Sequence, residues 1–66
     1  MNNILLNEMI KEYRERKRDW MIAQEEILKG NENPVYELTQ QYAIQYMSVI
    51  ETLLKRANIN IEELNL

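Results

Sequence analysis

The chain has 66 residues, of which 45% are hydrophobic and 29% charged, and its formal net charge is −3. It contains no cysteine and no histidine, which excludes a disulfide framework and the usual zinc sites. A chain of this size makes one small domain, and folding hides only about 60% of its surface. The acidic balance argues against a general nucleic-acid binder. Association with a second copy is the remaining way to enlarge so small a core.

Apolar runs along the chain are short. Runs such as Trp20–Ala23 fall far below the roughly 20 residues that cross a bilayer as a helix. No basic residue precedes the run Ile4–Leu6, so a secretory signal is not expected. The sequence predicts no membrane association and, by default, a cytoplasmic location. The abundance of Asn, Ile, Glu and Tyr suggests an AT-rich genome, such as that of a bacterium or its phage.

A first helix is predicted from about residue 3 to residue 29. Apolar or aromatic residues recur in it at heptad spacing, with others filling the i+3 and i+4 positions, which is the pattern of an amphipathic helix. Lys29 in the last turn and Gly30 beyond it form a helix stop. The heptad positions, which we expect in the hairpin core, are Leu6, Tyr13, Trp20 and Ile27.

The chain's only glycine and only proline both lie in the segment Gly30–Pro34. Glycine suits the left-handed position after a helix, and proline suits the first turn of the next one. Asn33 is the expected N-cap of a second helix. We therefore predict a loop at 30–33 and a second helix at about 34–57, which together make an all-α, antiparallel two-helix hairpin.

Apolar residues occupy about half the circumference of this second helix, in two neighbouring stripes. The first stripe, predicted to pack on the first helix, is Val35, Leu38, Tyr42, Tyr46, Val49, Leu53 and Ala57. The second stripe, predicted as a self-interface, is Ala43, Met47, Ile50 and Leu54. One neighbouring helix covers one stripe only. We therefore expect a homodimer that forms a four-helix bundle.

The tail, residues 58–66, offers an alternative to the dimer. Asn60–Glu63 has the form of a capping box for a short C-terminal turn or helix, and apolar residues flank it. A tail folded back over the second stripe would leave the chain a monomer.

A basic segment at Arg14–Arg18 lies between Tyr13 and Trp20. Basic residues interleaved with aromatic ones can bind single-stranded nucleic acid, but the two rings belong to the predicted core. The candidates for binding an acidic protein or phosphate are Arg14, Arg16, Lys17 and Arg18.

Catalytic chemistry is not predicted. The one serine, Ser48, lies in mid-helix, where its hydroxyl commonly returns to the backbone. Glu8, Glu12 and Glu15 share a helix face, but Glu37 and Glu51 on the second helix are too far apart to complete a metal site. No enzymatic activity, metal or cofactor is expected.

The segment Val35–Ala43 resembles the Ser-Gln-Glu-Leu-Asp signature of Spo0E-like aspartyl-phosphate phosphatases, which are small helical hairpins acting on a response regulator. Thr39 and Gln40 take the places of Ser and Gln, and Ala43 that of the Asp on which activity depends. The resemblance implies a diverged, catalytically dead regulator. The architecture is also similar to that of Rop-type RNA-binding hairpin dimers, by fold analogy alone.

From the sequence we therefore expect a non-enzymatic protein–protein interaction module, an adaptor, regulator or inhibitor, that self-associates through its second helix and binds a protein of unknown identity. A nucleic-acid-binding hairpin that uses residues 14–18 is the alternative.

Overall fold

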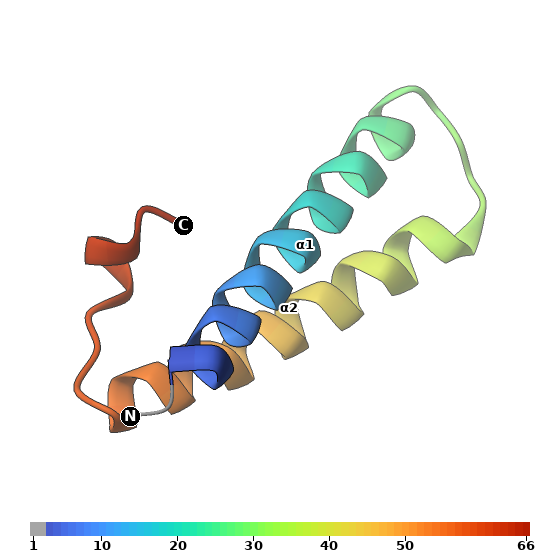
Figure 1. Cartoon of the computed structure of the whole chain (residues 1–66). Coiled ribbons are helices and arrows are strands. Elements are labelled where there is room, and N and C mark those ends of the chain that lie inside the picture. Colours follow the sequence, from blue (N-terminus) through green and yellow to red (C-terminus); the bar gives the residue numbers. More distant parts are fainter. Residues whose placement is uncertain (1–2) are drawn as a thin grey trace.

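The structure is a computed structural model that describes residues 3–66, and every regular element in this part of the chain is helical. Helix α1 (Asn3–Leu28) and helix α2 (Pro34–Arg56) lie side by side as an antiparallel hairpin, and a short 3-10 helix, η1 (Ile61–Leu64), follows (Figure 1). The predicted hairpin is confirmed. The molecule is elongated: its radius of gyration is 13.7 Å, against roughly 11 Å for a compact domain of this length.

Helix α1 ends in a Schellman motif centred on Gly30. The Gly30 amide donates to the Ile27 carbonyl (3.0 Å) and the Asn31 amide to the Glu26 carbonyl (3.1 Å). This pair of bonds requires a left-handed residue at the end of the helix, and Gly30 supplies it with φ +88°. The only glycine of the chain therefore fixes where α1 stops.

Asparagines define the ends of α2. The Asn33 side chain accepts a hydrogen bond from the Val35 amide (3.1 Å), which satisfies a free N–H of the first turn. At the other end Asn58 adopts φ 60° and donates to the Lys55 carbonyl, while the Ile59 amide donates to the Leu54 carbonyl. This is a second Schellman motif, with asparagine in the place of glycine.

Alanines are among the most buried residues of the core. Ala23 on α1 is 2% exposed and Ala43 on α2 is fully buried. A hydrogen bond from Gln40 Nε2 to Gln24 Oε1 (2.8 Å) sets the register of the two helices, so the two alanines lie within about one turn of the same height. Small side chains at this level allow the backbones to approach closely.

The second stripe, and not the first, packs against α1. Ile50 and Leu54 are 4% and 1% exposed, Ala43 is fully buried, and Met47 is half-buried. These residues were predicted as a self-interface, but their own chain already covers them. Residues of the first stripe, predicted as the hairpin core, are exposed instead: Leu38, Tyr42, Tyr46, Val49 and Leu53.

The packing of the second stripe, rather than the first, against α1 has a simple physical reason. Helical periodicity shows that two stripes exist but not which one faces the neighbour. Close packing favours the stripe that carries an alanine at the contact, because the helices then bury Ile50 and Leu54 completely. On α1 the predicted core residues are all half-buried: Leu6, Tyr13, Trp20 and Ile27.

The tail turns back along the hairpin (Figure 1). Asn60 caps η1 by accepting from the Glu62 amide (3.0 Å), as the capping-box pattern predicts. Lys17 Nζ donates to the backbone oxygen of Leu66 (2.6 Å), so the end of the tail reaches α1. The apolar residues of this segment, Ile59, Ile61, Leu64 and Leu66, are half-buried.

Candidate interaction surfaces

The first stripe is the most extensive exposed apolar feature of α2. Its large side chains are between 36% and 60% exposed: Val35, Leu38, Tyr42, Tyr46, Val49 and Leu53. The rings of Tyr42 and Tyr46 lie 5.8 Å apart at 46°, within the range of favourable aromatic pairs. Exposed tyrosines among aliphatic residues are typical of the centre of a protein interface.

Charged residues are absent from the middle of α2. Between Glu37 and Glu51 the sequence is Leu38–Ile50, and every polar residue in it is a glutamine, serine, threonine or tyrosine. Depletion of charge distinguishes the centre of an interface from ordinary surface. The exposed surface of α2 is therefore suited to contact with protein rather than with water.

A groove between the helices continues the first stripe toward α1. It has a volume of about 240 Å³. The α2 wall includes Val49 and Leu53, and the α1 wall includes Leu5, Glu8 and Glu12. Neither of these two carboxylates has an ion-pair partner among the described residues. This end of the hairpin therefore combines an apolar floor with an acidic edge.

The opposite side of the hairpin is tied together by polar contacts and the tail. The Tyr13 hydroxyl donates to Glu51 Oε1 (2.7 Å). This hydrogen bond, together with burial, raises the pKa of Tyr13 to about 12, because ionising the phenol would remove the bond and place two negative charges together.

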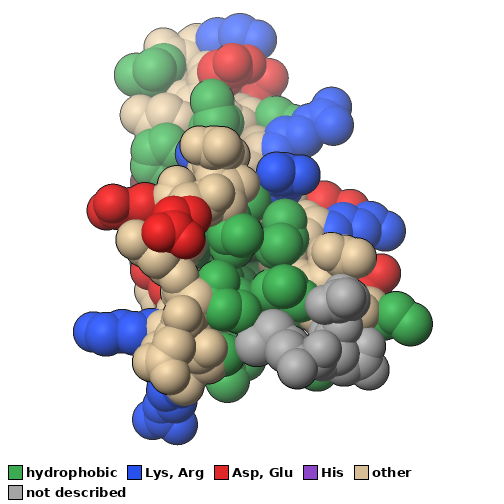
Figure 2. All heavy atoms as spheres, turned by 60° about the vertical axis from the view of Figure 1, so that its left-hand side comes forward, with side chains coloured by type: hydrophobic (Ala, Val, Ile, Leu, Met, Phe, Trp, Pro, Cys, Tyr) green, Lys and Arg blue, Asp and Glu red, His purple; other side chains and the backbone are tan. Residues whose placement is uncertain are grey.

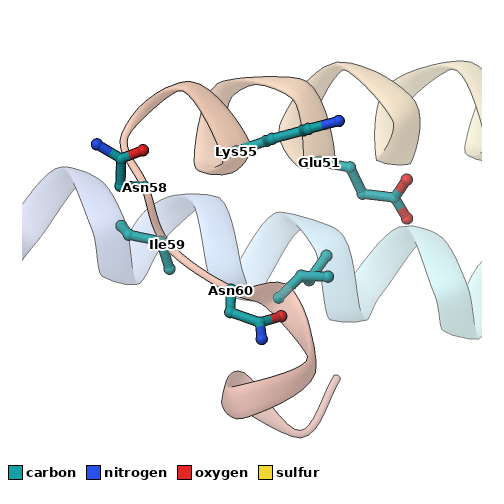
Figure 3. A pocket seen from close by; sticks show the side chains of 6 residues that line it. Glu51, Lys55, Asn58, Ile59 and Asn60 are labelled. Atoms are coloured by element: carbon teal, nitrogen blue, oxygen red, sulfur yellow. The ribbon is translucent and has the colours of Figure 1, made fainter.

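A groove of about 530 Å³ lies between Glu51 and Lys55 of α2 and the returning segment Asn58–Ile61 (Figure 3). From the side that carries the tail, hydrophobic side chains occupy the middle of the surface, with charged side chains around them (Figure 2).

The basic segment is divided between internal and external roles. Arg16 is half-buried and pairs with Glu15 (3.6 Å) and Asp19 (3.3 Å), and Lys17 is held by the tail. Arg14 and Arg18 are exposed and form no ion pair among the described residues. Of the predicted partner-binding candidates, Arg14 and Arg18 are therefore the ones left open to another molecule.

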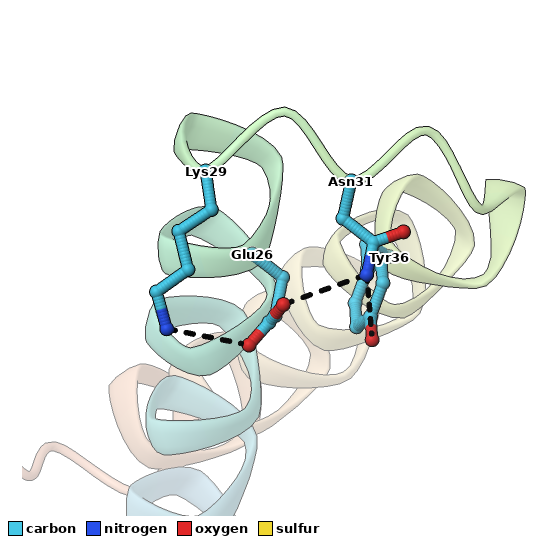
Figure 4. Close-up of polar contacts among 4 residues, drawn as sticks. All are labelled: Glu26, Lys29, Asn31 and Tyr36. Carbon is cyan, nitrogen blue, oxygen red and sulfur yellow. Dashed lines mark hydrogen bonds and ion pairs between the residues drawn. The ribbon is translucent and has the colours of Figure 1, made fainter.

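The interhelical loop has a local polar network. Glu26 pairs with Lys29 (3.6 Å) and accepts a bond from Asn31 Nδ2 (3.5 Å), which also lies 3.4 Å from the Tyr36 hydroxyl (Figure 4). These contacts join the end of α1 to the start of α2. Their geometry stabilises the turn.

No group of three or more acidic side chains that could hold a metal ion occurs within residues 3–66. Neither helix in that range has a stretch long and apolar enough to cross a bilayer.

In the segment that resembles the Spo0E-like signature, the residue at the position of the essential Asp is not exposed. Ala43, which takes the place of the essential Asp, is fully buried against α1. Comparisons with known proteins add no support for it: no family model, no curated protein and no solved structure matches this chain.

Proposed function

We propose that this chain is a non-enzymatic protein–protein interaction module that self-associates through α2, and that its interface is the exposed first stripe. The observation that carries the proposal is an uncharged segment, Leu38–Ile50, on a helix whose outward apolar side chains are about half exposed. Burying each such side chain fully stabilises an assembly by roughly 1 kcal/mol, about half the value for a side chain that starts fully exposed.

The surface area of the chain agrees with a second copy as the occupant. The accessible area is 5252 Å² for a mass of 8.0 kDa, whereas a monomeric protein of this mass exposes about 4,450 Å². The excess of about 800 Å² equals the area that each partner buries in a standard protein interface. A homodimer through the first stripe would restore the area typical of a folded protein.

Two variants of α2 test the proposal. Val49 lies in the first stripe and Ile44 on a different side of the same helix, and both are β-branched and more than half exposed. We expect light scattering coupled to gel filtration to give a dimer for the unmodified chain and for Ile44→Lys, and a monomer for Val49→Lys, because only the latter buries a lysine in the interface. A monomeric unmodified chain at about 100 μM, or a dimeric Val49→Lys variant, would refute the proposal.

An external partner is also part of the proposal. Exposed Arg14 and Arg18 suit an acidic protein surface. The nucleic-acid alternative uses the same two guanidinium groups, and a salt titration separates it, since phosphate contact requires an affinity for single-stranded DNA or RNA that falls steeply with salt. Absence of binding at low salt would remove that alternative.

A further inference from the structure

From the distribution of charge we infer that two copies pair with their interhelical loops at the same end, so that each α1 packs across the α2 of its partner and Glu8 meets Arg56 of the partner subunit. This inference rests on the proposed self-association and specifies its geometry. Two hairpins that share the same face can pair with their loops together or with their loops at opposite ends, and a two-fold axis permits both.

The α1 residues beside the first stripe are acidic. Glu8 and Glu12 line the groove at one end of the hairpin, and Asp19 lines a second hollow beside Val35 further along the same side. With the loops at opposite ends, α1 would pack on α1 in the antiparallel sense. Glu12 would then lie near Asp19 of the partner subunit, and all these carboxylates would share one seam with only Arg16 to offset them. Like charges placed together across an interface are strongly unfavourable.

With the loops together, α1 packs instead on the partner's α2. That helix is uncharged from Leu38 to Ile50, so no carboxylate meets another along the seam. Glu8 lies beside Leu53 in its own hairpin, because both line the same groove. When the two loops lie at the same end, Glu8 lies at the level of Leu53 of the partner subunit, one turn from Arg56 of the partner subunit.

Arg56 continues the first stripe. It follows Leu53 by three residues and Val49 by seven, and such spacing puts residues on one side of a helix. No ion pair of Arg56 occurs among the described residues. Its neighbour Lys55 faces elsewhere, since it lines the groove under the tail with Glu51. One cation of the last turn therefore points along the interface and the other does not.

The absence of cysteine allows a direct distance measurement. Glu32 is exposed in the loop and makes no ion pair among the described residues, so a spin label on Glu32→Cys reports the separation of the two loops by pulsed electron resonance. With loops together we expect roughly 15–25 Å, the width of a four-helix bundle with labels. With loops at opposite ends the distance would approach or exceed the 43 Å length of the molecule. A label on Ser48→Cys, near the middle of α2, should give a short distance in either arrangement and controls for dimer formation.

Charge reversal provides the second measurement. Arg56→Glu should weaken the dimer roughly three- to tenfold, as expected for an exposed ion pair replaced by repulsion, and Glu8→Lys should restore it. Lys55→Glu changes net charge equally and should leave the affinity unchanged. A dimer with a long Glu32→Cys distance, or one weakened equally by both α2 reversals, would overturn the arrangement while leaving self-association intact. A monomer by light scattering would overturn both.

Discussion

Leu53 and Leu54 are adjacent in the sequence, yet the structure gives them opposite roles. Leu54 is 1% exposed in the hairpin core and Leu53 is 48% exposed in the first stripe. Truncating each to alanine removes the same carbon atoms. For Leu54→Ala we expect a loss of about 3–5 kcal/mol, because the vacated volume is enclosed on all sides. For Leu53→Ala we expect a loss of about 1 kcal/mol in the monomer, since only half of the side chain is removed from water and no cavity forms.

These losses of unfolding free energy are large relative to the total stability of the chain. A chain of this length has an unfolding free energy of roughly 3–10 kcal/mol, so Leu54→Ala should remove about a third of it or more. Urea unfolding followed by far-UV circular dichroism, at a concentration low enough to keep the chain monomeric, measures both variants. At high concentration Leu53→Ala should lose further stability, because the dimer also stabilises the fold. Equal losses for the two variants at low concentration would refute the assignment of the core to the second stripe.

Two further predictions concern the polar contacts. Ionisation of Tyr13 is opposed in the folded state, where its pKa is about 12. Its contribution to stability should therefore be complete below pH 10 and should be lost as the pH rises from about 10 to about 12. Tyr13→Phe should abolish this part of the pH dependence of urea unfolding, and an unchanged alkaline profile would contradict the role of the Glu51 contact. Asn33→Ala should cost about 1 kcal/mol of unfolding free energy because it removes the N-cap of α2. Asn60→Ala removes an equivalent bond from η1 and should increase amide hydrogen exchange only in the tail. Comparable losses of unfolding free energy for both variants would show that the tail is part of the cooperative core.

The local structure of this chain is encoded in individual residues. Gly30 can adopt the left-handed conformation at little cost, and Asn33 with Pro34 suits the cap and first position of the next helix. The ends of both helices and the hairpin turn therefore follow from short-range geometry, and the sequence predicts them correctly to within a residue. The αL role of Asn58 is encoded in the same way, but asparagine is a weaker signal than glycine and the sequence pattern did not single it out.

The choice between the two apolar stripes of α2 depended on the tertiary structure. Both stripes have helical spacing and similar hydrophobicity, so periodicity cannot rank them. Contacts between residues far apart in the sequence decide it: the burial of Ala23 and Ala43 between the helices, the Gln24–Gln40 bond and the Tyr13–Glu51 bond. The same holds for Lys17, whose role depends on where the tail returns. The packing of α1 against α2 thus determines which surface of α2 stays exposed to a second molecule. Packing complementarity depends on the side chains of both helices, so neither helix sequence predicts it alone.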